Sequence, residues 1–210
     1  MIRVFIADDH ALIREGLKKI LKEESDMVVV GEASRAGEVV DILGETTVDI
    51  IVLDISMPDR SGLELLKDIK HLYPKIHVLM LSIHPEDRFA IRALKAGAAG
   101  YVTKESASDE LVKAIRRVVL GGKYVSANLA EHLASELNVT SEKPPHQTLS
   151  DREYEVMCLL ASGKTLKQIA ENLTLSLSSV NTYRSRILHK MNMTSSAELM
   201  HYAINNRLVD

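Results

Sequence analysis

Five polar side chains of this 210-residue chain stand at or just after the ends of short apolar runs. They are Asp8, Asp9, Asp54, Ser82 and Lys104. Clustered carboxylates repel one another unless a cation lies among them, and a small set of oxygen ligands suits Mg²⁺. An aspartate at such a site can accept a phosphoryl group, while a lysine and a serine contact the phosphate oxygens. Together the five residues therefore predict an aspartyl-phosphate site in which Asp54 accepts the phosphoryl group.

The apolar runs recur through the first half of the chain and are rich in β-branched residues. They cover residues 4–7, 28–30, 50–55, 78–81 and 100–102. Their apolar residues are nearly continuous rather than alternating, as expected for strands buried on both faces. Stretches with helical spacing separate them, so we predict an α/β fold, a five-stranded doubly wound parallel (βα)5 sheet. The carboxyl ends of such strands lie along one edge of the sheet, where the polar side chains would meet.

The second half of the chain carries only helical signals and follows a polar stretch with two prolines, Pro144 and Pro145. Because proline cannot continue a helix, we place a domain boundary there. The predicted division is a first domain over 1–122, a linker with one helix over 123–147, and a small all-α domain of four helices over 148–210.

Two of those four helices form a predicted helix-turn-helix, with residues 166–173 as the supporting helix and 178–191 as the recognition helix. The recognition helix carries polar side chains that can face a DNA groove while its apolar ones pack. The candidate DNA contacts are Asn181, Thr182, Arg184, Ser185 and Arg186, with Lys164, Lys167 and Lys190 for phosphates. A polar helix is also often merely solvated, so this pattern alone leaves both interpretations open.

The composition limits the class of protein in other ways. The net charge is −3, yet residues 148–210 hold seven Lys and Arg against six Asp and Glu, and no acid lies between Asn172 and Ala197. This balance predicts a modest DNA affinity for one copy, which dimerisation would raise. A single cysteine, Cys158, excludes an internal disulfide. Without a long apolar segment or a signal-peptide pattern, we expect a cytoplasmic protein with no membrane partner.

Two sets of motifs resemble known domains. The first comprises DDH at 8–10, LDISMP at 53–58 with Gly62, Ser82, AGA at 96–98 and GYVTK at 100–104, and it resembles the receiver domain of bacterial response regulators. The second comprises LSDREYEV at 149–156, Ile169-Ala170 and SVNTY at 179–183, and it resembles the LuxR-type helix-turn-helix. Together they are similar to the NarL/FixJ class of two-component regulators, with a recognition helix closest to the GacA/UvrY and BvgA-like branch.

This resemblance implies a role for each matching position. Asp54 would be phosphorylated by a sensor histidine kinase, with Mg²⁺ bound by Asp8, Asp9, Asp54 and the backbone carbonyl of Ser56. Ser82 and Tyr101 would be the switch residues, and Lys104 would pair with the phosphoryl group. The resemblance further implies binding of double-stranded DNA and a homodimer when phosphorylated.

Two other classes of protein remain as alternatives. An aspartate-nucleophile phosphatase needs a second acid two residues after the nucleophile, where this chain has Ser56. We therefore expect no enzyme that turns over an external substrate. The other alternative is a DNA-binding regulator whose activity does not depend on phosphorylation. The presence of all five residues, Asp8, Asp9, Asp54, Ser82 and Lys104, argues against this alternative.

Overall fold

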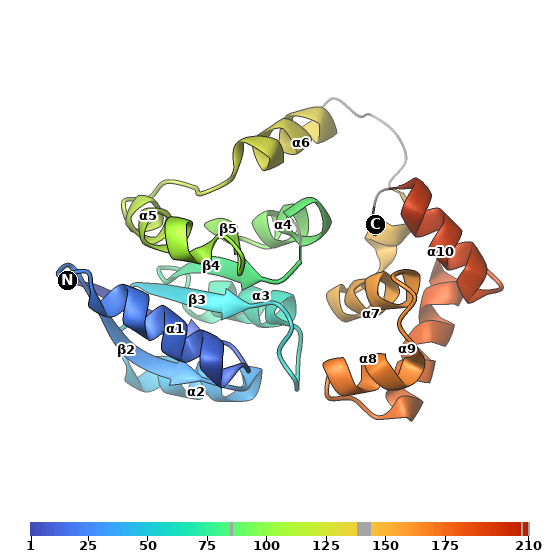
Figure 1. Ribbon diagram of the computed structural model, residues 1–210, viewed down its shortest axis with the longest axis horizontal. Coiled ribbons are helices and arrows are strands. Elements are labelled where there is room, and N and C mark those ends of the chain that lie inside the picture. Colours follow the sequence, from blue (N-terminus) through green and yellow to red (C-terminus); the bar gives the residue numbers. More distant parts are fainter. Residues whose placement is uncertain (85, 138–143, 207, 210) are drawn as a thin grey trace. The chain divides into compact units, whose positions relative to one another are not determined.

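The computed structural model describes residues 1–84, 86–137, 144–206 and 208–209. The chain divides into two compact units, Met1–Leu137 and Asn138–Asp210, each of which can be followed in Figure 1. Residues 138–143 of the predicted linker lie outside the described part of the chain. The domain boundaries that the sequence suggests stay a prediction.

The first unit contains the expected parallel sheet, whose strands are ordered β2-β1-β3-β4-β5. The strands are β1 Ile2–Ala7, β2 Met27–Ala33, β3 Ile50–Asp54, β4 His77–Ser82 and β5 Gly100–Thr103. All five residues of β3 are buried, as their continuous apolar pattern predicts. The order of the strands reverses between β1 and β3, which is the position where doubly wound sheets bind their ligands.

Helices cover both faces of this sheet (Figure 1). Along the chain they are α1 Ala11–Lys22, α2 Ala36–Glu45, α3 Gly62–Leu72, α4 Glu86–Lys95 and α5 Ala107–Val119. The next helix, α6 Ala127–Leu137, packs against α4. Leu17 and Leu21 of α1 pack with Leu111 and Ile115 of α5 against the strands to form one buried cluster. The predicted α/β class is therefore confirmed.

The second unit is entirely helical in its described residues, as predicted. It comprises a 3-10 turn, Pro145–Thr148, and the helices α7 Asp151–Ala161, α8 Leu166–Asn172, α9 Leu177–Lys190 and α10 Ser196–Asn205. Helix α7 packs against α9 and α10, and α8 packs against α9. No described helix is long and apolar enough to cross a membrane.

The helix starts of this unit follow their capping side chains. Ser150 and Glu153 form a capping box at the start of α7. At α10 such a box is only half formed: Ser195 accepts from the Glu198 amide, but the Glu198 carboxylate accepts from the amide of Thr194 and not from that of Ser195.

Candidate functional site

The carboxyl ends of β1 and β3 place three aspartates next to one another. Asp54 is the last residue of β3, and Asp8 and Asp9 directly follow β1, which pairs with β3 in parallel. Asp8, Asp9, Asp54 and His10 each offer one ligand atom, and these atoms lie within 4.8 Å of one another. Asp8 and Asp54 are buried, whereas His10 is exposed. The topology of the sheet therefore creates a concentrated negative charge at its switch point.

The ammonium group of Lys104 lies between two of these carboxylates. Its Nζ is 2.8 Å from Asp54 Oδ2 and 2.7 Å from Asp8 Oδ2. Lys104 comes one residue after β5, and its backbone amide donates to the carbonyl of Ser82 at the end of β4. Residues from β1, β3, β4 and β5 thus meet at one edge of the sheet, as their positions after the strands predict.

Burial sets the protonation of Asp54. Removal from water raises the pKa of its carboxyl to about 6, the Asp8 carboxylate adds to this rise, and the ammonium of Lys104 opposes it. The same two carboxylates raise the pKa of Lys104 against the opposing effect of its burial. Oxygen donors so close together fit a divalent cation such as Mg²⁺, which would relieve the repulsion that Lys104 only partly balances.

The remaining predicted residues of this site lie on β4, on β5 and just after β3. Ser82 is buried, and its Oγ accepts from the His84 amide at 3.0 Å. Tyr101 is buried as well, and its hydroxyl donates to the backbone carbonyl of His84 at 2.9 Å. The amide of Ser56 lies 3.4 Å from Asp54 Oδ1. The segment after β4 therefore connects the hydroxyl of Ser82 with the ring of Tyr101.

Gly62 is required by the space beside Asp54. A Cβ atom at this position would lie 1.9 Å from the backbone oxygen of Asp54, and backbone cannot move aside as a flexible side chain can. Gly62→Ala should therefore lower the free energy of unfolding by about 3 kcal/mol or more, measured by urea denaturation. Gly16→Ala is the matched control, because Gly16 is exposed in α1 and nothing lies within 4 Å of its Cβ position.

This control should raise the stability of the protein by up to about 1 kcal/mol, because alanine favours the interior of a helix. Equal, small effects of the two substitutions would contradict the close approach of α3 to the end of β3.

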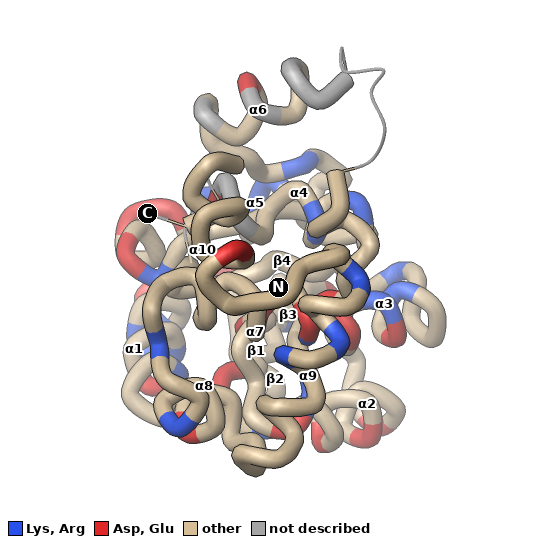
Figure 2. The backbone as a smooth tube through the Cα atoms, turned by 90° about the vertical axis from the view of Figure 1, so that its right-hand side faces the viewer, with Lys and Arg blue, Asp and Glu red and all other residues tan. Residues whose placement is uncertain are grey.

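The recognition helix α9 presents a mixed surface. Asn181, Thr182, Ser185 and Arg186 are exposed, and the helix contains no acidic residue, as the colours of Figure 2 let the reader follow. Val180 and Ile187 are buried at helical spacing from one another, so they hold the opposite side of α9 against its neighbours. Of the predicted contacts at 181–186, all except Arg184 are thus exposed to a partner.

The other predicted DNA contacts differ in their surroundings. Arg184 is half-buried, and its Nε donates to Ser196 Oγ at the start of α10. Lys190 Nζ lies 2.6 Å from the Glu153 carboxylate. Lys164 and Lys167 are exposed at the beginning of α8 and just before it. Two of the candidates, Arg184 and Lys190, therefore also bind neighbouring helices.

Arg152 is a residue of this unit that the sequence pattern did not single out. Its guanidinium donates to the carbonyl of Leu173 at 3.0 Å, in the turn between α8 and α9, and to Glu155 at 2.7 Å. In that turn Thr174 has φ of 51°, a left-handed conformation that is strained for a β-branched residue. Arg152 thus fixes the turn that sets the recognition helix. In the sequence Arg152 looks like an ordinary first-turn residue between the capping residues Ser150 and Glu153.

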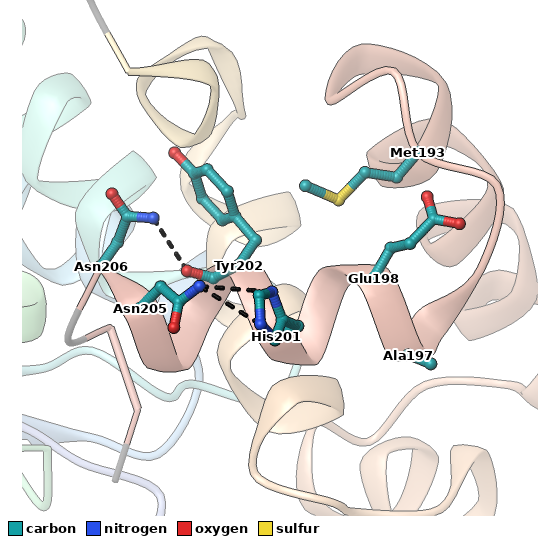
Figure 3. Close-up of a pocket in the computed structure, with 7 residues that line it drawn as sticks. All are labelled: Met193, Ala197, Glu198, His201, Tyr202, Asn205 and Asn206. Atoms are coloured by element: carbon teal, nitrogen blue, oxygen red, sulfur yellow. Dashed lines mark hydrogen bonds between the residues drawn. The ribbon is translucent and has the colours of Figure 1, made fainter.

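A shallow pocket of about 560 Å³ lies along α10 (Figure 3). It is lined by Met193, Ala197, Glu198, His201, Tyr202, Asn205 and Asn206. Asn205 Nδ2 lies 3.2 Å from His201 Nδ1, and Asn206 donates to the carbonyl of Tyr202. The hydroxyl of Tyr202 lies 2.9 Å from His146 Nδ1, and the Glu198 carboxylate accepts from Thr194, so these side chains connect α10 to the segments beside it.

A sheet that collects aspartates and a lysine at its switch point, together with a helix-turn-helix unit, defines the class of DNA-binding response regulators. The chain belongs to this family: residues 4–116 match the response regulator receiver domain, and residues 147–203 match the luxR family of bacterial regulatory proteins. It is thus a two-component response regulator of the NarL/FixJ type with a LuxR-type DNA-binding domain, a transcription regulator.

Named relatives resemble the chain over its whole length. The response regulator UvrY of Escherichia coli K12 is 36% identical over 209 residues, which cover 99% of this chain and 96% of UvrY. The response regulator GacA of Pseudomonas aeruginosa is 35% identical over 211 residues, which cover 100% and 99%.

A solved structure resembles it as well. RcsB of Salmonella enterica serovar Typhimurium, bound to the promoter rprA in the presence of the phosphomimetic BeF3⁻, matches with a TM-score of 0.65. It is 25% identical, and the match covers 96% of this chain and 98% of that one. The family, its fold and the GacA/UvrY-like branch predicted from the motifs are confirmed.

Proposed function

We propose that a sensor histidine kinase switches this regulator by phosphorylating Asp54, and that the phosphorylated form binds DNA. The observation that carries the proposal is the position of the Asp54 carboxylate. It ends β3 beside two further carboxylates and lies 2.8 Å from Lys104 Nζ. An aspartate in this position has both a cation site and a phosphate-binding lysine within reach.

The phosphoryl transfer is a displacement at phosphorus. A carboxylate oxygen of Asp54 forms a bond to phosphorus while the bond from phosphorus to the imidazole nitrogen of the kinase histidine breaks, and that nitrogen keeps the electron pair. Mg²⁺, held by Asp8, Asp9, Asp54 and the backbone carbonyl of Ser56, would neutralise charge on the phosphoryl oxygens. Lys104 then exchanges its contact with Asp54 Oδ2 for a phosphoryl oxygen. The chain is not proposed to turn over an external substrate.

The change of charge would reach the rest of the sheet through the segment after β4. A phosphoryl group adds a charge of about −1.5 to −2 beside Asp54. The Ser82 hydroxyl accepts from the His84 amide, and its own O–H can donate to a phosphoryl oxygen. Tyr101 holds the carbonyl of the same His84, so movement of this segment alters the surroundings of its ring. Ser82 and Tyr101 are therefore the proposed switch residues.

The proposed DNA surface is the exposed side of α9. Asn181, Thr182, Ser185 and Arg186 would contact bases or phosphates there, and Arg184 would act from the side that binds α10. Lys164, Lys167 and Lys190 are proposed phosphate contacts. Since one copy offers few cations, we propose that phosphorylation produces a homodimer that binds two half-sites of double-stranded DNA, in the cytoplasm.

The test measures DNA affinity before and after phosphorylation. The protein is incubated with Mg²⁺ and acetyl phosphate, and its mass in solution and its affinity for DNA fragments selected from a genomic library are measured. We expect the mass to double and the affinity to rise by at least about tenfold, because two linked recognition helices bind together. Unchanged affinity on a fully phosphorylated sample would instead support a regulator that ignores phosphorylation.

A further inference from the structure

The loop that carries Ser56 is attached to the start of helix α2 by one side chain. Asp59 accepts two hydrogen bonds across 22 and 23 residues of sequence: Oδ1 from the amide of Ala36 and Oδ2 from the amide of Gly37, both at 2.9 Å. Ala36 and Gly37 are the first two residues of α2. Asp59 therefore links the loop between β3 and α3 to a different helix.

This link replaces a cap that α2 lacks. The residue before the helix, Arg35, provides no side-chain hydrogen bond to its first turn. The first amides of a helix have no partner within it, and a carboxylate there also interacts favourably with the helix dipole. Burial alone would raise the pKa of Asp59, but the hydrogen bonds from Gly37 and Ala36 bring it below its ordinary value. Asp59 is thus held in its charged form at the start of α2.

The side chain acts close to the acidic site. Asp59 comes three residues after Ser56 and five after Asp54. Within the loop, the amides of Met57 and Gly62 donate to the carbonyl of Ile55 at 3.1 and 2.7 Å. These bonds close the base of the loop, whereas Asp59 attaches its far part. The path of the Ser56 backbone is thus fixed from both sides.

The loop after β1 is attached to the end of β2. The amide of Asp8 donates to the carbonyl of Ala33 at 3.2 Å. Arg14 donates to the carbonyl of Asp8 at 2.8 Å, and its Nε lies 3.4 Å from the Glu32 carboxylate. Residues 32–37 comprise the end of β2, the turn after it and the start of α2. They therefore contact both loops that bear the acidic residues.

We propose that residues 32–37 are the support of the cation site and that Asp59 is its positioning residue, which holds the Ser56 loop ready for Mg²⁺. This inference rests on the proposed function of the acidic cluster. Groups that orient metal ligands typically change metal affinity by about 10- to 100-fold when they are removed. Asp59 would act in this way on the backbone of the loop and not on the ion itself.

The experiment measures the affinity of the protein for Mn²⁺ by electron paramagnetic resonance. Added Mg²⁺ should displace the bound Mn²⁺, which shows that both cations bind at the same site. Asp59→Ala should weaken Mn²⁺ binding by about tenfold. Asp59→Asn keeps one acceptor oxygen and should therefore retain part of the Mn²⁺ affinity that Asp59→Ala loses. It replaces the alanine variant in the comparison if that variant does not fold. Hydrogen exchange of the Ala36 and Gly37 amides should become faster in both variants. The matched control is Asp41→Ala, an exposed acid elsewhere on α2.

Mn²⁺ affinity of a folded Asp59→Ala protein equal to that of the wild type would overturn the inference, even if both amides exchanged faster. Failure of the proposed function has a different signature. In that case the wild-type protein would bind Mn²⁺ but take no phosphoryl group from acetyl phosphate, and the comparison of affinities between variants would still decide the role of Asp59.

Discussion

Asp54→Asn should abolish phosphorylation of this protein by acetyl phosphate in the presence of Mg²⁺. The substitution keeps the shape of the side chain but removes the nucleophilic oxygen, and nothing else in the cluster replaces a carboxylate that ends β3 beside Lys104. Intact-mass spectrometry should show one phosphoryl adduct on the wild-type protein and none on the variant. Asp41→Asn, at an exposed position on α2, should be phosphorylated like the wild type. An adduct on the Asp54→Asn protein would refute the assignment.

The same variant should be more stable than the wild type without Mg²⁺. The pKa of Asp54 is about 6 in the folded protein, above its ordinary 3.8, so the native state binds this proton more tightly than the unfolded chain does. Above pH ~6 the charged Asp54 carboxylate therefore lowers the free energy of unfolding. As the pH falls through about 6 the carboxylate takes up a proton in the folded protein, and this destabilisation decreases. We expect a gain of about 1–3 kcal/mol for Asp54→Asn at neutral pH, shrinking toward pH ~5. Urea denaturation at several pH values measures it.

Arg186→Ala should weaken DNA binding more than any lysine substitution among the predicted contacts. Arg186 is exposed on α9, and an arginine that makes two hydrogen bonds to a guanine edge is worth about 1–3 kcal/mol. The expected loss is roughly 5- to 150-fold in affinity, measured by fluorescence anisotropy with the selected fragments. Lys190→Ala should cost less, since Lys190 already pairs with Glu153.

The matched control for charge is Lys19→Ala, which removes one exposed cation from α1 in the other unit. Its DNA affinity should equal that of the wild type. An Arg186→Ala protein that binds selected and random fragments as the wild type does would show that the exposed side of α9 does not read DNA.

The sequence was sufficient for the strands and for the acidic cluster because both depend on local pattern. Continuous β-branched runs identified the five strands, although the edge strand β2 is only partly buried and its Val28 is exposed. Parallel strands then bring their carboxyl ends to one edge, so Asp8, Asp54 and Lys104 can be grouped from the sequence alone. The helix-turn-helix was equally accessible, because apolar spacing and capping residues mark where its helices begin.

Contacts between distant segments were not accessible in this way. Arg152 resembles an ordinary first-turn residue until its guanidinium meets the Leu173 carbonyl. Arg184 looks like a base-reading residue in the pattern, yet its side chain also binds Ser196. The Thr165 and Gln168 capping box of α8 was missed although its signal was present.

The amino-acid order by itself determined which residues carry chemistry and on which edge of the sheet they stand, because side-chain type and strand direction are local properties. Only the tertiary structure decided how those residues are held. Asp59 caps a helix that begins 23 residues earlier, and Gly62 fits where a Cβ would lie 1.9 Å from the Asp54 carbonyl. The physical reason is that hydrogen bonds and close contacts depend on distances in space, which local spacing in a sequence does not encode.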